Sequence, residues 1–193
     1  MTSFVCMTKI SAKTVKSSEV VLTELMIPSY ANFGGKVHGG ILLSLMDKVA
    51  YVCAAQYCHQ YCVTVAVEGV AFLNPVEVGE LVSFKASVNY VGKTTMIIGI
   101  RVEANNPRTG ETKHTNSSYF TMAAKNEQGE LVEVPSLVLE DEVQLRRFCE
   151  GKMIKAFSAE KRRLLKADLE DAPLHDRLQM CNDERCQIEF VSA

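Results

Sequence analysis

The chain has 193 residues, which suits one domain with a tail or two very small domains. Its hydrophobic content of 47% and charged content of 23% are ordinary for a globular protein and exclude a disordered chain. The net charge of -2 gives no general attraction to nucleic acid or to an anionic membrane, and no run of about 18 or more apolar residues predicts a membrane-spanning helix.

The first part of the chain predicts one strand and one long helix. Residues 1–13 lack a clear pattern, whereas 18–26 (SEVVLTELM) are β-branched and apolar enough for a strand that ends before Pro28. The following stretch, IPSYANFGGKVHGG, is rich in turn residues. From residue 40 to about 57 the hydrophobic period becomes helical. The arc expected to face a sheet consists of Ile41, Leu42, Leu45, Met46, Val49, Val52 and Cys53.

Asp47 stands out in this helix because it lies off the apolar arc among neighbours that are themselves mostly apolar. Those neighbours are Leu43, Ala50, Tyr51 and Ala54. This flank is therefore expected to be covered by a second surface, such as another subunit.

The middle of the chain predicts four more strands separated by short turns. They are expected at 63–73, 81–91, 94–105 and 111–126. Consecutive strands with short connections favour an antiparallel sheet, and one long apolar helix beside such a sheet indicates an α+β fold.

The end of the chain predicts a charged helix over 139–165, followed by a polar segment, 166–193, expected to be a flexible tail. Within that tail, 188–191 (IEFV) could add a strand. The expected organisation is an N-terminal extension (1–14), one domain (15–138), a helical segment (139–165) and the tail.

The seven cysteines are an odd, scattered set, and the N-terminus MTSFVCMTKISAK does not resemble an export signal. We therefore expect reduced thiols and a cytoplasmic protein. Cys53, Cys58 and Cys62 lie close to His59, but their spacing is not that of a zinc site, so buried thiols are favoured over a metal.

Three segments, 28–47, 67–104 and 106–135, resemble the hotdog-fold acyl-CoA thioesterases, in particular the broad-specificity acyl-CoA hydrolase branch. The most specific is PSYANFGGKVHGGILLSLMD, in which an Asn, a glycine-rich turn ending in HGG and a helix place Asp47 fifteen residues after Asn32. The family's usual Asn-x-x-Gly opening stands here as Asn32-Phe33-Gly34-Gly35. The resemblance spans roughly residues 15–165 and leaves the tail without a counterpart.

This resemblance implies a hotdog fold, in which an antiparallel sheet wraps around one long central helix, here with a C-terminal helix added. It implies homodimers with one continuous sheet, often assembled as trimers of dimers, that is, hexamers. It further implies active sites between subunits, acyl-CoA as substrate, a place in fatty acid metabolism and no metal or cofactor. Neither nucleic acid nor membrane insertion is expected.

In this family reading, Asp47 and Asn32 are the catalytic residues, contributed to one site by opposite subunits. Asp47 activates water against the thioester carbonyl or attacks that carbonyl itself, and the sequence leaves both routes open. Asn32 offers an amide that can hold water or the carbonyl. The competing interpretations are an ordinary helix aspartate, perhaps paired with Lys48, and an ordinary turn asparagine.

Gly39 and Gly40 are expected to form an oxyanion hole, since the N–H groups at a helix start are free to bind developing negative charge. The alternative is a simple glycine turn that leads into the helix. His38 is expected to line the site without an essential proton transfer, and Phe72 to line the channel for the acyl or pantetheine chain.

The phosphates of coenzyme A suggest two further binding groups. One is the turn Gly92-Lys93-Thr94-Thr95, for which an ordinary hairpin is an equally good interpretation. The other is Arg162 and Arg163, which could equally be a solvated helix end.

Two other functions remain open from the sequence. The first is an acyl-thioester dehydratase or hydratase on the same fold, disfavoured because Asn32 occupies the loop position where such an enzyme usually needs a histidine. The second is a non-catalytic acyl-CoA-binding module, disfavoured because binding alone does not require Asp47.

Overall fold

The computed structural model describes residues 11–166, 172–182 and 184–189, and the chain divides into two compact units, 1–153 and 154–193. The elements in chain order are β1 (Lys13–Thr14), η1 (Val15–Ser18), β2 (Val20–Leu25), η2 (Pro28–Tyr30), α1 (Gly39–Cys58), β3 (Tyr61–Phe72), β4 (Leu81–Val91), β5 (Thr95–Asn105), β6 (Thr112–Lys125), β7 (Leu137–Val138), α2 (Glu142–Leu165) and α3 (Leu174–Gln179).

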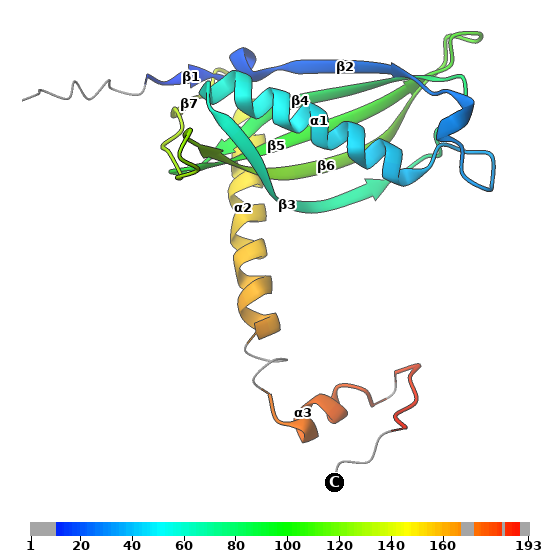
Figure 1. Ribbon diagram of the computed structural model, residues 1–193, viewed down its shortest axis with the longest axis vertical. Helices are drawn as coiled ribbons and strands as arrows, with labels where there is room; N and C mark the ends of the chain where they lie inside the picture. The colour runs from blue at the N-terminus through cyan, green and yellow to red at the C-terminus, as the bar shows by residue number, and fades with distance from the viewer. Residues whose placement is uncertain (1–10, 167–171, 183, 190–193) are drawn as a thin grey trace, which may run out of the picture. The chain divides into compact units, whose positions relative to one another are not determined.

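The main sheet has five strands in the order β2-β4-β5-β6-β3, and each neighbouring pair is antiparallel (Figure 1). The predicted antiparallel sheet is therefore confirmed, and each expected strand is found within about two residues of its predicted bounds. β3 forms one edge of the sheet and pairs with β6 along a register that shifts twice, between Thr64 and Ala66 and between Val67 and Val70. These irregularities bend the edge strand as it passes α1.

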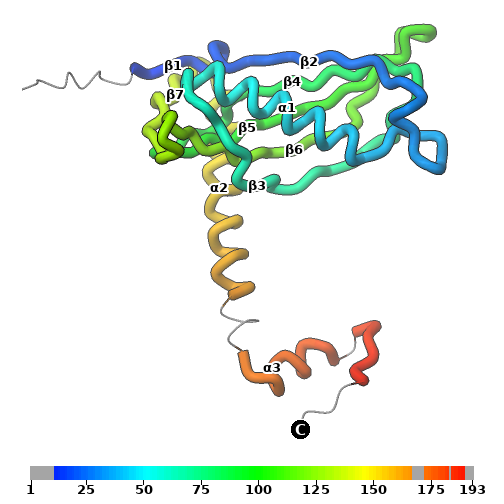
Figure 2. Tube along the Cα trace, in the orientation of Figure 1, coloured from blue at the N-terminus to red at the C-terminus, as the bar shows by residue number. Residues whose placement is uncertain are grey.

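Helix α1 lies across one face of the sheet and supplies much of the core (Figure 2). The predicted arc is correct for Leu42, Leu45, Met46, Val49 and Cys53, which are all buried. It is wrong for Val52, which is 42% exposed. Ala50, Ala54 and Tyr57 are buried instead, so the contact face is turned toward the side that carries Asp47. Small alanines let this side approach the sheet closely.

The ends of α1 are set by two histidines. Nδ1 of His38 accepts a hydrogen bond from the N–H of Gly40 (2.9 Å) and so caps the first turn. His59 adopts a left-handed conformation (φ 53) and its N–H donates to the Ala55 carbonyl, which ends the helix. By length and composition α1 could cross a membrane, but half of it is buried against the sheet, as expected for the core helix of a folded domain.

The opposite face of the sheet contacts the first turns of α2. The rings of Tyr90 and Phe148 lie 5.0 Å apart, and the Tyr119 hydroxyl donates to Glu150 at 3.0 Å. Gly151 approaches the sheet so closely that a Cβ there would lie 2.6 Å from Cβ of Tyr90. Gly151 is thus the point where α2 contacts the sheet most closely.

The shortest elements were not predicted. β1 and β7 pair in parallel over two residues each, which is too short for a period to show. In the second unit, the segment expected to be a tail contains the short helix α3, while Ile188 and Glu189 are not in a strand. The last two residues of the possible strand, and residues 1–10 of the expected N-terminal extension, lie outside the described part of the chain.

Candidate functional site

Asp47 lies on the flank of α1 that faces strand β3. Its carboxylate Oδ1 accepts a hydrogen bond of 2.6 Å from the hydroxyl of Thr64. The same hydroxyl lies 3.4 Å from Sδ of Met122, so Thr64 is held between the helix and the sheet. The recorded partner of Asp47 is therefore Thr64 across the fold rather than its neighbour Lys48. This bond orients one carboxylate oxygen and leaves the other available to a reactant.

The surroundings of Asp47 are apolar but open to solvent in the single chain. Large apolar side chains on the same part of α1 and on β3 remain exposed by 37% to 58%. These are Leu43, Tyr51, Tyr61, Val65 and Val67. Several exposed apolar side chains on one helix flank and the adjacent edge strand favour a contact with another protein surface.

Asn32 lies in the loop before α1, where its side chain organises a tight turn. Oδ1 accepts from the N–H of Gly34 (2.8 Å) and the N–H of Lys36 (3.2 Å). An ion pair of 2.6 Å between Lys36 and Glu77 ties this loop to the segment before β4. Among the described residues no hydrogen-bond partner is recorded for Nδ2 of Asn32, so its amide donor remains available.

A cavity of about 350 Å³ adjoins the start of α1 and brings together three of the predicted residues, Asn32, Gly39 and Phe72. The Phe72 ring lies against Gly39, where a Cβ would meet it at 3.3 Å. A side chain at this position would press on the ring, which would have to move by a few tenths of an ångström. The rest of the lining comprises Lys36, Val37, Leu42, Leu73, Asn74, Pro75 and Val76.

The two glycines at the start of α1 differ in what their N–H groups do. The N–H of Gly40 donates to His38 (2.9 Å), so in this conformation it is not free to bind a ligand, contrary to expectation. The N–H of Gly39 has no recorded partner in the described part of the chain. A ligand oxygen would therefore meet Gly39 first, and Gly40 only if the His38 cap opens.

The family model of the Thioesterase superfamily matches residues 34–111. Protein VdlD of Helicobacter pylori is 44% identical over 135 residues, which cover 70% of this chain and 77% of VdlD. The uncharacterized acyl-CoA thioester hydrolase YkhA of Bacillus subtilis is 32% identical over 130 residues, covering 67% and 76%. A crystal structure of an apo-hexameric acyl-CoA thioesterase has a TM-score of 0.78 at 28% identity, covering 80% of this chain and 99% of the other. The chain belongs to the thioesterase superfamily.

The predicted residues at the β4–β5 turn of this thioesterase do not line the cavity. Gly92, Lys93, Thr94 and Thr95 form the turn between β4 and β5, where Lys93 pairs with Glu133 at 3.3 Å. Arg162 and Arg163 belong to the second unit, where Arg163 pairs with Glu160 at 2.6 Å. Their proposed contact with coenzyme A phosphates stays a prediction.

The thioesterase also contains a close pair of thiols. Sγ of Cys58 and Sγ of Cys62 lie 3.4 Å apart at the junction of α1 and β3, and both side chains are buried. The hydrogen bond from Cys62 lowers the pKa of the Cys58 thiol to about 7, and the same bond raises the pKa of Cys62. Within the described ranges, no three His, Cys, Asp or Glu side chains are grouped as metal ligands.

The sequence did not identify Thr64 as a member of the site. It stands second in the predicted strand 63–73, and threonine is common in strands, so its type carries no signal. Only the packing of α1 against β3 shows that its hydroxyl contacts Asp47.

Proposed function

We propose that this thioesterase hydrolyses acyl-coenzyme A to a free carboxylic acid and coenzyme A. The observation that carries the proposal is the carboxylate of Asp47, held by the Thr64 hydroxyl at 2.6 Å on an exposed apolar flank beside the edge strand β3. A carboxylate in this exposed position contributes little to the stability of the single chain. It becomes useful when a second chain covers the flank and brings an acyl thioester to it.

In the first route, Asp47 acts as general base. One carboxylate oxygen takes a proton from water as the water oxygen bonds to the thioester carbonyl carbon. The carbon–sulfur bond then breaks, coenzyme A leaves as a thiolate, and that thiolate receives the proton from Asp47. The Thr64 hydrogen bond holds the other oxygen throughout, which keeps the base aimed at one place.

In the second route, the same carboxylate bonds to the carbonyl carbon, the coenzyme A thiolate leaves, and a mixed anhydride forms. Water then cleaves this anhydride and restores Asp47. In both routes the carbonyl oxygen gains negative charge, and donors are required for it. The free Nδ2 of Asn32 and the N–H of Gly39 are the donors that suit this role, with Phe72 beside them as the apolar wall.

Asn32 and Asp47 meet in this proposal only when two chains associate. β3 has a partner strand on one side only among the described strands, and the exposed apolar residues around Asp47 adjoin its free edge. Two copies joined through this edge would form one continuous sheet and cover Asp47. A trimer of such dimers is the proposed final assembly, in line with the hexameric thioesterase described above.

The proposed reaction uses water, one carboxylate and hydrogen-bond donors, so we propose that it needs no metal or cofactor. The proposed location is the cytoplasm, because the described cysteines are all free, including Cys58 and Cys62. Hydrolysis of fatty acyl-CoA would place the enzyme in fatty acid metabolism.

The test is a thiol-release assay over acetyl-, medium-chain and long-chain acyl-CoA with the wild type and with Asp47→Asn. We expect the wild type to hydrolyse at least one chain class. We expect Asp47→Asn to lose at least a hundredfold in kcat/KM, about 3 kcal/mol of transition-state stabilisation.

Lys48→Gln is the control, since it alters the adjacent exposed side chain and should keep its activity. An Asp47→Asn variant that turns over like the wild type would remove this carboxylate from the mechanism. A wild type that binds these esters without releasing thiol would contradict hydrolysis altogether.

A further inference from the structure

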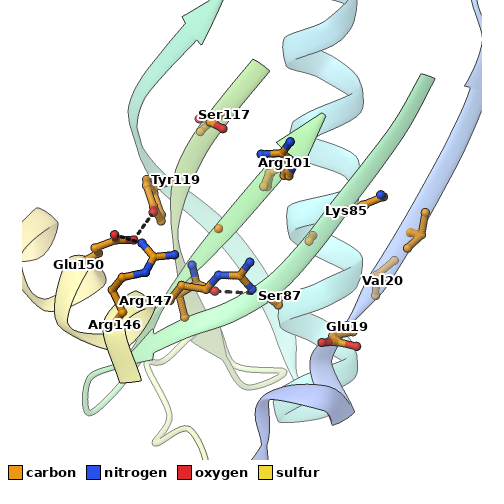
Figure 3. A pocket seen from close by; sticks show the side chains of 16 residues that line it. Glu19, Val20, Lys85, Ser87, Arg101, Ser117, Tyr119, Arg146, Arg147 and Glu150 are labelled. Atoms are coloured by element: carbon orange, nitrogen blue, oxygen red, sulfur yellow. Dashed lines mark hydrogen bonds and ion pairs between the residues drawn. The ribbon is translucent and has the colours of Figure 1, made fainter. Parts of the chain in front are cut away.

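A groove lies on the sheet face opposite α1, away from Asp47 and Thr64. It has a volume of about 520 Å³ and lies over β4, β5 and β6, between β2 and the first turns of α2 (Figure 3). Residues on the other face of the same strands, such as Phe84, Ile98 and Phe120, form the core under α1. The sheet therefore separates this groove from Asp47.

The floor of the groove carries a buried amide with a free donor. Asn89 is only 5% exposed, and its Oδ1 accepts a hydrogen bond from the Ser87 hydroxyl at 3.0 Å. Within the described residues its Nδ2 has no recorded partner. Asn89 lines the groove, so this amide donor is placed where a ligand acceptor can bind it.

Gly99 makes room for this amide. A Cβ at Gly99 would lie 2.2 Å from Nδ2 of Asn89, so any side chain there would displace the amide. The sequence places its only interior glycine of β5 directly beside the buried asparagine. Asn89 and Gly99 thus form a small polar cradle in the middle of the sheet.

The rim of the groove is mainly cationic. Lys85, Arg101, Arg146 and Arg147 line it, against the carboxylates of Glu19 and Glu150. Lys85 and Arg101 share one more carboxylate, Glu103, at 2.5 and 2.7 Å, and together they lower its pKa to about 2. Four cations therefore face three carboxylates, which leaves an excess of positive charge.

Arg147 differs from the other cations of the rim. Arg146 is paired with Glu150, whereas no hydrogen bond or ion pair is recorded for Arg147 among the described residues. Arg147 is partly buried on α2, and its side chain extends into the groove toward Ser87 (Figure 3). A guanidinium offers several N–H donors in a planar array that suits phosphate oxygens.

We propose that this groove binds a small molecule that bears phosphate, with the phosphate oxygens between Arg147, Arg101 and the amide of Asn89. The apolar part of the ligand would lie against Val20, Val21 and Ile100, which line the same groove. The volume is within the range of small-molecule sites. Two sources share this chemistry, a separate nucleoside diphosphate and the nucleotide end of coenzyme A itself.

The test is calorimetric titration of the full chain with inorganic pyrophosphate, ADP and coenzyme A. We expect saturable binding of ADP or pyrophosphate by the wild type. Arg147→Gln should weaken that binding about tenfold, since it removes a charged donor without breaking an ion pair. Gly99→Ala should weaken it as well by displacing the amide, without changing the charge.

Arg108→Gln is the matched control, because it removes the same charge from the exposed turn between β5 and β6. Thermal unfolding of each variant checks that its fold is retained, and Arg101→Gln replaces Arg147→Gln if that variant does not fold. If the groove variants weaken coenzyme A along with ADP, the groove holds the nucleotide end of the substrate. If they weaken ADP alone, the ligand is a separate nucleotide.

The proposal is overturned if the wild type binds none of the three probes, or if Arg147→Gln and Gly99→Ala bind them as Arg108→Gln does. Titration measures binding without turnover. Its failure would therefore leave hydrolysis by Asp47 standing, and an inactive enzyme would leave this site standing.

Discussion

The two faces of the sheet differ in how they are built and in what they can bind. The face under α1 is closed by apolar side chains, and its polar features, Asp47 with Thr64 and Asn32 with Gly39, lie at the flank and the end of the helix. Within the described residues of the first unit, the opposite face contacts the first turns of α2 and keeps a groove with several charged side chains. One face thus forms the apolar core, with the proposed catalytic residues at its border, and the other is a polar surface that contacts α2.

This difference explains why the proposed catalytic residues lie at the flank and at the start of α1 and not in the core. A carboxylate in the middle of the core would have to be neutral or paired. A carboxylate at the flank stays in contact with water in the single chain and is covered only when a second chain binds. The outer face faces no such constraint, so it can keep several charges in water.

The largest expected effect tests whether Asp47 of one chain and Asn32 of another form one active site. Asp47→Asn and Asn32→Ala should each be nearly inactive alone. Co-expressed as differently tagged chains that exchange subunits, they should recover about a quarter of the wild-type activity, since half the dimers are mixed and each has one intact site.

The measurement is thiol release by the doubly purified mixed dimer and by the unfractionated mixture. If the mixed dimer forms but stays inactive, Asn32 and Asp47 do not share a site across two chains.

A smaller effect is expected on the outer face, where Gly151 lets α2 approach Tyr90. Gly151→Ala places a Cβ 2.6 Å from Cβ of Tyr90, and neither atom is at a flexible end. We expect a loss of about 1–3 kcal/mol in the free energy of unfolding, because overpacking forces the helix to shift.

Urea unfolding followed by tyrosine fluorescence measures this loss, with the adjacent exposed Lys152→Ala as control. Equal stability of the two variants would show that α2 can move away from Tyr90 at no cost.

The smallest expected effect concerns the bond between Thr64 and Asp47. Thr64→Val keeps the shape of the side chain but removes the donor, so one carboxylate oxygen loses its hydrogen bond of 2.6 Å. We expect kcat to fall about tenfold, or about 1.4 kcal/mol, with little change in KM.

Thr23→Val on β2 is the control, because its hydroxyl lies 3.1 Å from that of Ser83 on the exposed surface, and β2 is at the opposite edge of the sheet from β3. A Thr64→Val enzyme with unchanged kcat would show that this hydroxyl does not position the carboxylate.

The sequence was sufficient to predict the helix, the strands and an antiparallel sheet, because each element has a clear hydrophobic period and ends at a turn signal. It did not predict the order of the strands in the sheet. The sequence was less reliable for features that depend on contacts between particular side chains. The rotation of α1 depends on the small size of Ala50 and Ala54, and the cap formed by His38 uses a residue type that is rarely assigned that role.

The sites illustrate the same limit. Asp47 could be identified because a carboxylate among apolar neighbours is unusual in a helix, and the resemblance to a family gave it a role. Thr64 and the groove of Asn89, Gly99 and Arg147 could not be found, since their parts come from separate elements and each residue is ordinary in its own segment. Only the folded chain brings them together.

The edge strand β3 also has a consequence for the newly made chain. Twelve residues, Tyr61–Phe72, present a bare backbone edge with a single charged side chain, Glu68. Such an edge can recruit any extended segment and start aggregation before the right partner arrives. The two register shifts divide the edge of β3 into short regular lengths, which limits how many backbone hydrogen bonds an incorrect partner strand can form. The same strand that we propose joins two copies of the chain therefore also limits incorrect pairing before they associate.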